Sequence, residues 1–493
     1  MINSFFKKII IYSLLSIYSF AVNVNTTSTI KPEYFGAVGN GIVDDTLAVI
    51  KASKMAFLNH KPFEGNALYK VTTNQIPELA KIKRIGKGQF NIEITNLQGE
   101  LQNDLLYVDP KRQNVPNKHN KKEYKLRTLV GLKDKYAAFP KGVMHKNEDI
   151  LFAYYLGLRH VGGGPSEARA VISRDYGESW KDYFIAGNLT NTLKGYGYAY
   201  DTALGLDKYG NYLALITLSC NKDVERYRTY SQEGVFWSHP TKIHFGSVAG
   251  KLYKNQKRDS LTGDPATGVS EIVFFGNIKK MSNGTLVVMA YIANTNWLAV
   301  NDSGLGDTWN LRLIRENSDG LRISEMALGI AKNDDMIAIA RVDGKISSMY
   351  QFVSFNKGKT WRPLGYTNLE KNGGNIPQNI EFVIMGGKEY FYLDRGVRMS
   401  ISGTSKFANS YVRDQCLVKE CLVSPKKWQE AIYTKRFPQN DDLGEEENAR
   451  RDYYSTGIKM NDSNSVLVVI HEETKLSKTE ESKIKLFSYI LKE

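Results

Sequence analysis

Two tryptophan-ended octapeptides are the feature that most constrains the fold of this 493-residue chain. Ser173–Trp180 and Ser354–Trp361 both follow the pattern Ser-x-Asp/Asn-x-Gly-x-Ser/Thr-Trp. In this pattern the Ser and Asp/Asn side chains bond nearby backbone groups, Gly takes the tight turn, and Trp anchors the hairpin in a core. The chain has only six Trp, so two copies indicate an internal repeat. The octapeptides therefore predict a repeated β-hairpin, and they carry no chemistry of their own.

From Thr128 onward, apolar runs occur in pairs separated by a polar turn, which is typical of antiparallel strands. Six such units follow at spacings of about fifty to seventy-five residues, enough for four strands each. The octapeptides fall in the outer hairpins of units one and four, and a damaged third copy is predicted at Asp302–Trp309 in unit three. We therefore predict an all-β fold, a six-bladed β-propeller over residues 128–493. The strands expected beside the central turns are Ile150–Tyr155, Tyr212–Thr217, Thr285–Tyr291, Met336–Ala340, Tyr390–Leu393 and Val466–Ile470.

The region before these units differs in character. Two lysines followed by the apolar run Ile9–Val22 indicate a signal peptide over residues 1–21, and hence a secreted, periplasmic or cell-surface protein. A buried N-terminal helix or strand is the alternative for the same residues. Residues 22–127 are expected to form a small α/β segment and a basic linker, with Asp44 and Asp45 capping a short helix.

Composition limits the partners of the chain. The formal net charge of +14 favours encounter with polyanions, and no nucleic-acid-binding motif accompanies it, so an acidic polysaccharide is expected rather than nucleic acid. No later segment has membrane-spanning length without charges, so no membrane partner is expected after leader removal. Cys416 and Cys421 could form a disulfide outside the cytosol or remain buried thiols. Their spacing fits no zinc site, and neither a metal nor a cofactor is expected.

Charged residues flank the strands of two consecutive units. Glu325 precedes the strand pair of unit four, Arg341 follows its return strand, and Arg395 follows the return strand of unit five. Because the innermost strands of a propeller surround its axis, such residues can face a central cleft. A carboxylate can serve as the acid or base of a glycosidase, and two arginines can hold a substrate carboxylate by forked hydrogen bonds. The alternative is two ordinary surface ion pairs, Arg341 with Asp343 and Arg395 with Asp394.

In their order along the chain, Glu325, Arg341 and Ser354–Trp361 resemble the catalytic blade of bacteriophage endosialidase, in which the octapeptide is the Asp-box. Arg395 falls where that family has a second active-site arginine. The glycine-rich segment Tyr34–Thr46 is similar to the start of phage tailspikes. The resemblance implies a sialidase-like propeller with Glu325, Arg341 and Arg395 as its catalytic residues.

The resemblance also suggests substrate-binding residues. Arg159 and His160 resemble an Arg-His pair near the first Asp-box of the family, and Tyr200 and Asp201 stand where it has an aromatic residue followed by His. Exosialidases carry Arg-Ile-Pro at the start of the propeller, where this chain has Phe139-Pro140. Two other departures from the family pattern follow. The region 221–268 is too short for the family's inserted barrel. The chain ends after unit six, so no phage-type trimerising segment is expected, and the oligomeric state stays open.

The implied activity is that of an endo-acting glycoside hydrolase cleaving the α2,8-sialosyl linkages of polysialic acid, or a related acidic nonulosonic-acid polymer. Because no motif marks a second carboxylate or a tyrosine nucleophile, an inverting reaction with water is predicted. The alternative function is a propeller lectin that binds an acidic capsular polysaccharide without cutting it.

Overall fold

The computed structural model describes most of the chain, in two compact units that are treated separately. One unit comprises Met1–Val115 with Phe236–His239, and the other Pro116–Val235 with Pro240–Glu493, so they divide upstream of the predicted boundary at 127. The signal peptide predicted over 1–21 lies outside the described residues. None of the described helices is long and apolar enough to cross a bilayer. The described residues are 27–113, 124–125, 127–132, 135–158, 165–188, 199–220, 223–246, 272–292, 295–316, 321–343, 349–369, 375–400, 407–433, 454–460, 465–475 and 480–490.

The first unit is a small α/β arrangement, as predicted. Its main sheet has the order β1-β3-β5-β6, with parallel pairs except for the antiparallel β5–β6 hairpin. Asp45 stands at the N-cap position of α2, but its carboxylate accepts hydrogen bonds from Val38 N and Gly39 N, so it fixes the preceding loop. The capping bond comes instead from Asp44, which accepts from Thr46 N at 2.9 Å. The elements are η1 (Pro32–Phe35), β1 (Asn40–Asp44), α2 (Thr46–Leu58), β2 (Phe63–Glu64), β3 (Leu68–Val71), α3 (Glu78–Lys81), β4 (Arg84–Ile85), β5 (Gln89–Thr95), β6 (Leu101–Tyr107) and η2 (Pro110–Gln113).

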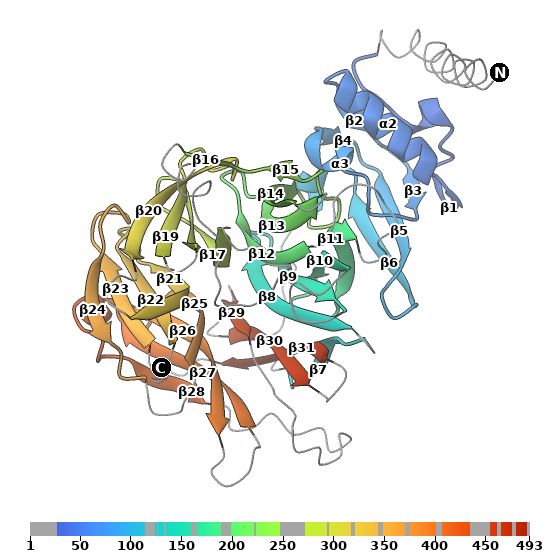
Figure 1. Cartoon of the computed structure of the whole chain (residues 1–493). Helices are drawn as coiled ribbons and strands as arrows, with labels where there is room; N and C mark the ends of the chain where they lie inside the picture. Colours follow the sequence, from blue (N-terminus) through green and yellow to red (C-terminus); the bar gives the residue numbers. More distant parts are fainter. Residues whose placement is uncertain are drawn as a thin grey trace, which may run out of the picture. The chain divides into compact units, whose positions relative to one another are not determined.

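The second unit is all-β and propeller-like. Its antiparallel sheets follow one another around a ring in Figure 1, from β8–β11 through β21–β24 to β29–β31, which return beside β8. The strands are β7 (Arg127–Val130), β8 (Tyr136–Met144), β9 (Ile150–Gly157), β10 (Ser166–Ser173), β11 (Lys181–Asn188), β12 (Ala199–Leu206), β13 (Tyr212–Cys220), β14 (Asp223–Ser231), β15 (Thr241–Lys242), β16 (His244–Phe245), β17 (Val273–Lys280), β18 (Leu286–Ile292), β19 (Thr295–Asn301), β20 (Thr308–Glu316), β21 (Arg322–Ile330), β22 (Met336–Asp343), β23 (Met349–Ser354), β24 (Arg362–Tyr366), β25 (Asn375–Met385), β26 (Lys388–Ser400), β27 (Phe407–Leu417), β28 (Gln429–Tyr433), β29 (Ser455–Lys459), β30 (Ser465–Lys475) and β31 (Glu480–Ile490). Each strand predicted beside a central turn is present, and several extend further than expected.

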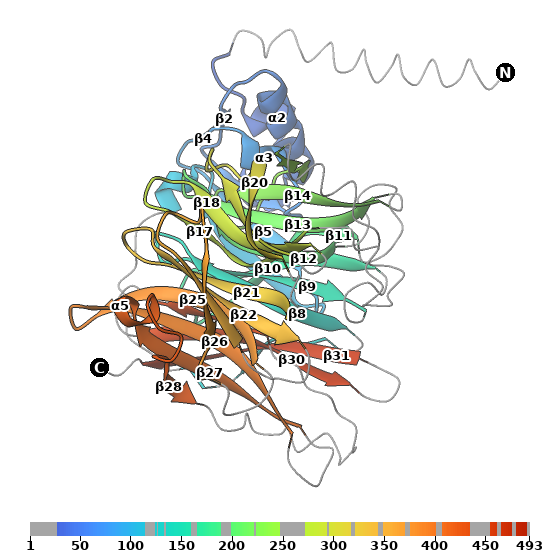
Figure 2. The ribbon, with the colours of Figure 1, turned by 60° about the vertical axis from the view of Figure 1, so that its left-hand side comes forward.

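The ring is closed by strands from both ends of the unit. β7 pairs antiparallel with β31, within a sheet of the order β11-β10-β9-β8-β31-β30-β29. β31 also bridges to β8 in parallel, through Ser482 and Tyr136. Figure 2 shows β30 and β31 beside β8 from a second direction. Because strands far apart in sequence share this sheet, the closure ties the first and last sheets together.

The first strand of each sheet lines the centre of the ring. β8, β12, β17, β21, β25 and β29 each contact the next of these strands around the ring, and β29 contacts β8. Five of these strands carry a break in register against their second strand. The breaks lie between Ala138 and Lys141, Ala199 and Thr202, Phe275 and Lys279, Ile323 and Met326, and Pro377 and Asn379. Such bulges re-aim side chains, and here they recur at the matching place of successive inner strands.

The octapeptides form the outer hairpins that the sequence predicts. In the first, Gly177 N donates to Ser173 Oγ at 2.7 Å and Trp180 Nε1 donates to Gly177 O at 3.1 Å. In the second, Gly358 N donates to Ser354 Oγ at 2.9 Å. Gly358 has φ +71°, and an added Cβ would collide with Leu298, so glycine is required there.

The damaged third copy forms the same hairpin between β19 and β20. Gly306 N donates to Asn301 Oδ1 at 2.9 Å, and Trp309 Nε1 donates to Gly306 O at 3.0 Å. Asn301 thus takes the place of Ser, and the motif begins one residue earlier than predicted. Counted from Asn301, the motif has one residue more than the octapeptides, and its Trp309 anchor is still fully buried.

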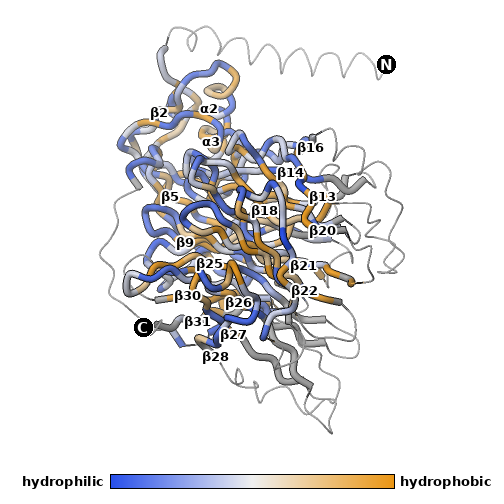
Figure 3. Tube along the Cα trace, turned by 90° about the vertical axis from the view of Figure 1, so that its left-hand side faces the viewer, coloured by the Kyte–Doolittle hydropathy of each residue, from blue (hydrophilic) through white to orange (hydrophobic). Residues whose placement is uncertain are grey.

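Apolar side chains fill the spaces between neighbouring sheets. One cluster joins β21–β24 to β25–β28 through residues such as Ile337, Ile380 and Leu393, and Figure 3 shows the hydrophobic residues concentrated along strands such as β18 and β25. Cys416 and Cys421 lie in this cluster as a disulfide across α5 (Val418–Cys421), which resolves the alternative that the sequence left open. This packing holds the inner strands in place around the centre.

Candidate functional site

Glu325 and Arg341 form a direct ion pair at the centre of the ring. Glu325 lies in the bulge of β21, and Arg341 lies opposite it on β22. Arg341 Nη1 donates to Glu325 Oε2 at 3.1 Å; the Glu325 side chain is 12% exposed and that of Arg341 37%. Both residues stand within strands, whereas the sequence predicted them just before and just after. The pair therefore belongs to one hairpin, and it leaves the second carboxylate oxygen of Glu325 for another donor.

That donor is Tyr454, which directly precedes β29. Its hydroxyl donates to Glu325 Oε1 at 2.9 Å. Burial raises the pKa of Tyr454 well above its ordinary value, and the Glu325 carboxylate raises it further. The phenol is therefore protonated in the unliganded site and oriented by the carboxylate. A carboxylate in hydrogen-bond contact with a hydroxyl is the arrangement of a general base and the nucleophile it activates.

Aromatic rings hold Tyr454 in place. Phe139 meets the Tyr454 ring edge-to-face at 4.9 Å between centroids, and His471 stacks on it at 6.0 Å. Phe139 and His471 also contact each other at 5.4 Å. Phe139 lies in the bulge of β8 with φ +55°. Phe139 and His471 thus form an aromatic wall around the Tyr454 ring.

Arg395 has a different environment from Arg341. It lies within β26 and is 3% exposed, and it forms a two-pronged ion pair with Asp414 on β27 (Nε–Oδ2 2.5 Å, Nη2–Oδ1 3.3 Å). Burial raises the pKa of Asp414, and Arg395 opposes that shift. Asp394, the partner considered from sequence, instead accepts from Gly457 N at 2.9 Å. The clamp of Arg341 and Arg395 around a substrate carboxylate stays a prediction.

Of the four predicted substrate-binding residues, the structure describes the backbone of two. Arg159 and His160 lie outside the described residues. Tyr200 and Asp201 belong to β12, at the register break between Ala199 and Thr202. Their backbone is therefore placed like that of Glu325 in β21. Their roles stay predictions.

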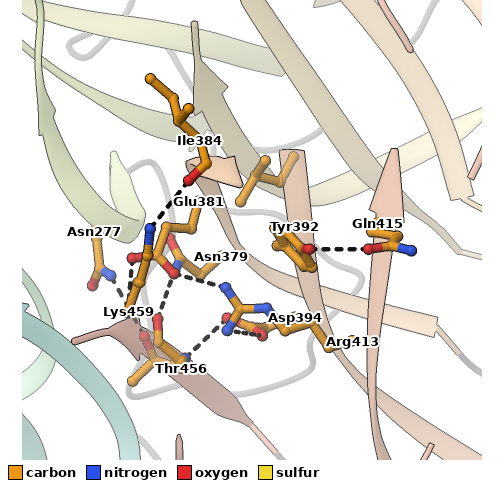
Figure 4. A network of polar contacts seen from close by, with 12 residues as sticks. Asn277, Asn379, Glu381, Ile384, Tyr392, Asp394, Arg413, Gln415, Thr456 and Lys459 are labelled. Atoms are coloured by element: carbon orange, nitrogen blue, oxygen red, sulfur yellow. Dashed lines mark hydrogen bonds and ion pairs between the residues drawn. The ribbon is translucent and has the colours of Figure 1, made fainter. Parts of the chain in front are cut away.

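A polar network joins three inner strands, and Figure 4 shows part of it, including Asn277, Asn379 and Thr456. Asn379 Nδ2 donates to Gly457 O at 3.3 Å, and Asn277 Nδ2 donates to Thr456 Oγ1 at 3.5 Å. Lys279 Nζ donates to Asn379 Oδ1 at 2.8 Å and to Ile380 O at 2.9 Å. Burial lowers the pKa of Lys279 to about 8. The network links β17, β25 and β29, and its Asn379 directly follows the bulge of β25.

The described residues contain no group of three or more His, Cys, Asp or Glu side chains able to hold a metal ion. Glu325 and Arg341 were predicted from the sequence as site residues, and Tyr454 was not. The one sequence signal for Tyr454 is its position. Tyr454 directly precedes β29, the inner strand of the last sheet, and Glu325 lies near the start of β21, the inner strand of its own sheet. That strand, Ser455–Lys459, is short and partly polar, so the apolar pattern did not mark it.

No protein-family model matches the chain, and no curated protein matches its sequence. Solved structures do match its fold. A protein of unknown function from Dyadobacter fermentans has a TM-score of 0.50 at 15% identity, covering 75% of this chain and 99% of the other. The leech intramolecular trans-sialidase has a TM-score of 0.50 at 11% identity, covering 75% and 70%. A structure described as NanB plus Optactamide has a TM-score of 0.51 at 12% identity, covering 74% and 70%.

At these identities the likeness concerns the fold alone. The chain has an all-β, propeller-like fold that is similar to that of the leech intramolecular trans-sialidase. The predicted sialidase-like fold is thus confirmed at this level, and a phage endosialidase is not singled out. The chemistry of a fold of this kind depends on the residues of its site.

Proposed function

We propose that the chain is a glycoside hydrolase of the sialidase type, with Glu325, Tyr454 and Arg341 as its reacting centre. The observation that carries the proposal is the hydrogen bond of 2.9 Å from Tyr454 to Glu325, whose other oxygen is held by Arg341. Sialidases are the glycosidases that use a tyrosine nucleophile. A structural ion pair would not need a buried phenol on the second carboxylate oxygen.

In this proposal the first step breaks the glycosidic bond. Glu325 takes the phenolic proton of Tyr454 as the Tyr454 oxygen attacks the anomeric carbon; the bond from that carbon to the glycosidic oxygen breaks, and the leaving sugar's oxygen takes a proton from water. Water then hydrolyses the glycosyl-tyrosine, so the anomeric configuration is retained. This route replaces the inverting reaction predicted from sequence, because that prediction rested on the absence of a placed tyrosine. Both routes use Glu325, and the configuration of the first product separates them.

A neutral nucleophile suits an acidic sugar. A nonulosonic acid carries a carboxylate on its anomeric carbon, so an approaching carboxylate nucleophile would be repelled, whereas a phenol is uncharged until its proton leaves. A guanidinium has five N–H donors, so Arg341 can hold Glu325 and still bind the substrate carboxylate. The net charge of +14 favours capture of a long anionic polymer. We therefore propose endo-cleavage of polysialic acid or a related polymer.

We also propose that the sheets are six blades of one propeller, with β7 closing the last blade. The antiparallel pairing of β7 with β31, next to β30 and β29, is the observation in favour of this closure. Export is proposed from the leader predicted over residues 1–21. The Cys416–Cys421 disulfide supports export, because such bonds persist in oxidising compartments.

The test is incubation with polysialic acid while chain length is followed by anion-exchange chromatography. Shortening into internal fragments by wild type, lost in Glu325→Ala and in Tyr454→Phe, supports the proposal. Retention on a polysialic-acid column without shortening supports the lectin instead. If the chain neither cleaves nor retains polysialic acid or other acidic capsules, the substrate assignment is wrong.

A further inference from the structure

β29, the short strand that directly follows Tyr454, has one neighbouring strand and one free edge. Among the described strands it pairs only with β30, and it ends the order of its sheet. On the β30 side, His471 N donates to the Tyr454 carbonyl at 2.7 Å. Because the N–H groups of an antiparallel strand alternate between its two edges, those of Gly457 and Lys459 face away from β30. Backbone groups at such an edge need partners from elsewhere in the fold.

Two carboxylates take the place of a second neighbouring strand. Gly457 N donates to Asp394 Oδ2 at 2.9 Å, and Lys459 N donates to Glu381 Oε1 at 2.9 Å. Asn379 Nδ2 adds to this edge by donating to the Gly457 carbonyl at 3.3 Å. Hydrogen bonds from N–H groups to ionised carboxylates are stronger than those between neutral groups, so the free edge of β29 is firmly held.

Arg413 holds both carboxylates in place. Its Nη2 lies 2.7 Å from Glu381 Oε2 and its Nη1 lies 3.4 Å from Asp394 Oδ1 (Figure 4). Asp394 and Arg413 are fully buried. The three residues lie on adjacent strands of one sheet, β25, β26 and β27. This Glu381–Arg413–Asp394 cluster is therefore a support for β29 that is built by a different sheet.

Gly457 lets β29 approach the cluster closely. A Cβ added at Gly457 would lie 2.5 Å from Arg413 Nη1 and 3.0 Å from Asp394 Oδ2. The φ of Gly457 lies outside the left-handed region, so the need for glycine here is one of space. Tyr454 stands three residues earlier, which is about 10 Å along a strand. Its hydroxyl lies 2.9 Å from Glu325 Oε1, and a shift of about 1 Å would break that hydrogen bond.

We propose that the Glu381–Arg413–Asp394 cluster positions the nucleophile Tyr454. By replacing a neighbouring strand along β29, the cluster sets the distance at which the phenol meets Glu325. Its members are positioning residues, because they act through β29. A reacting group displaced by about 1 Å can lose about 100-fold in rate. The assignment rests on the proposed function, in which Tyr454 attacks the anomeric carbon.

Gly457→Ala tests the cluster by pushing β29 away from Arg413. We expect kcat on polysialic acid to fall by about 10- to 100-fold while KM stays unchanged, because Arg341 is untouched. Gly205→Ala is the matched control: it overpacks another inner strand, β12, where the added Cβ would lie 2.6 Å from Ile278 Cβ and 2.6 Å from Ile278 O. We expect a lower Tm in both variants and an unchanged kcat in Gly205→Ala. Equal kcat in the two variants would overturn the assignment.

A second measurement uses no substrate. Tyr454→Phe is introduced into wild type, Gly457→Ala and Gly205→Ala, and the midpoints of urea unfolding are compared. We expect Tyr454→Phe to lower the midpoint in wild type and in Gly205→Ala. In Gly457→Ala the displaced phenol has already lost its hydrogen bond to Glu325, so Tyr454→Phe should leave the midpoint unchanged. An equal lowering in all three backgrounds would mean that the cluster does not position Tyr454.

The two measurements separate failure of this assignment from failure of the proposed function. Wild type that does not cleave polysialic acid would overturn the proposed function, and the unfolding midpoints would then decide by themselves whether the cluster positions Tyr454. If Gly457→Ala does not fold, Glu381→Ala replaces it in both measurements, with the same results expected. Glu381→Ala removes the acceptor of Lys459 N and leaves Asp394 paired with Arg413.

Discussion

The hydroxyl of Tyr454 lies 2.9 Å from Glu325 Oε1, although the two residues are 129 positions apart in the chain. Arg341 holds the other oxygen of the same carboxylate at 3.1 Å. The Glu325 carboxylate is thereby fixed at both oxygens, by a cation on one side and by a phenol on the other. This contact turns a pair of charged residues on one hairpin into a candidate reacting centre built from two separate sheets.

Tyr454→Phe removes the phenol and keeps the ring. We expect kcat to fall by about 10³-fold or more, the scale of losing a nucleophile, while stability falls by only about 1–3 kcal/mol for one hydrogen bond to a charged group. Tyr392→Phe is the control, since Tyr392 also donates to a side chain, Gln415 Oε1, at 3.0 Å. Steady-state rates and thermal melts on both variants check this. Equal kcat in the two variants would contradict a chemical role for Tyr454.

Arg341→Met removes the exposed cation beside Glu325. We expect KM for an anionic substrate to rise by about 10- to 100-fold, because a charge-assisted bond to its carboxylate is lost. Arg312→Met is a control that also removes one arginine and one hydrogen bond, from Arg312 Nη1 to Lys357 O at 2.9 Å. Kinetics across salt concentrations check the result, since the effect of a partly exposed cation weakens as salt rises. An unchanged KM in Arg341→Met would rule out carboxylate binding by this residue.

Arg395→Met leaves the buried Asp414 carboxylate without its partner. Breaking a buried pair in this way costs about 3–5 kcal/mol, so we expect a clear fall in the free energy of unfolding. Replacing both residues, as Arg395→Met with Asp414→Leu, should recover most of the lost free energy of unfolding. Urea unfolding of wild type, the single variant and the double variant measures this free energy. If Arg395→Met is as stable as wild type and only KM rises, the predicted clamp role is the correct one.

Lys279 gives stability a specific pH dependence. Its pKa is lowered from 10.5 to about 8 by burial, so between these values the unfolded chain binds more protons than the folded one. Stability from this group therefore rises with pH through that window. Between pH 8 and 9.5 wild type should gain about 1.5 kcal/mol relative to Lys279→Met. Urea unfolding of both proteins across this range checks the sign, and a falling difference would show that Lys279 stays charged when folded.

Local sequence patterns were sufficient to predict the hairpins of the fold. The octapeptides and the paired apolar runs were enough to predict the hairpins, because a turn and its two strands are adjacent in sequence. Glu325 and Arg341 were found together for the same reason, since they lie across one hairpin. The bulges of the inner strands have no recognisable sequence pattern. The predicted positions of Glu325 and Arg341 at strand ends were therefore wrong.

Contacts between sheets could not be predicted in this way. Tyr454 reaches Glu325 only because the ring brings β29 and β21 together, and no motif records that approach. Asp414 lies on the strand after Arg395, and the sequence offered Asp394 as a nearer partner. Which charge meets which in a buried pair depends on strand register, which is set by the whole sheet. The roles of Arg159, His160, Tyr200 and Asp201 stay predictions.

The configuration of the first product tests the central claim most directly. Proton NMR of an α-sialoside during early turnover distinguishes the two anomers before they interconvert. A reaction through Tyr454 predicts that the α-anomer appears first and that the signal is absent in Tyr454→Phe. First release of the β-anomer, with activity kept in Tyr454→Phe, would contradict the claim and restore the water-based inverting route with Glu325 alone.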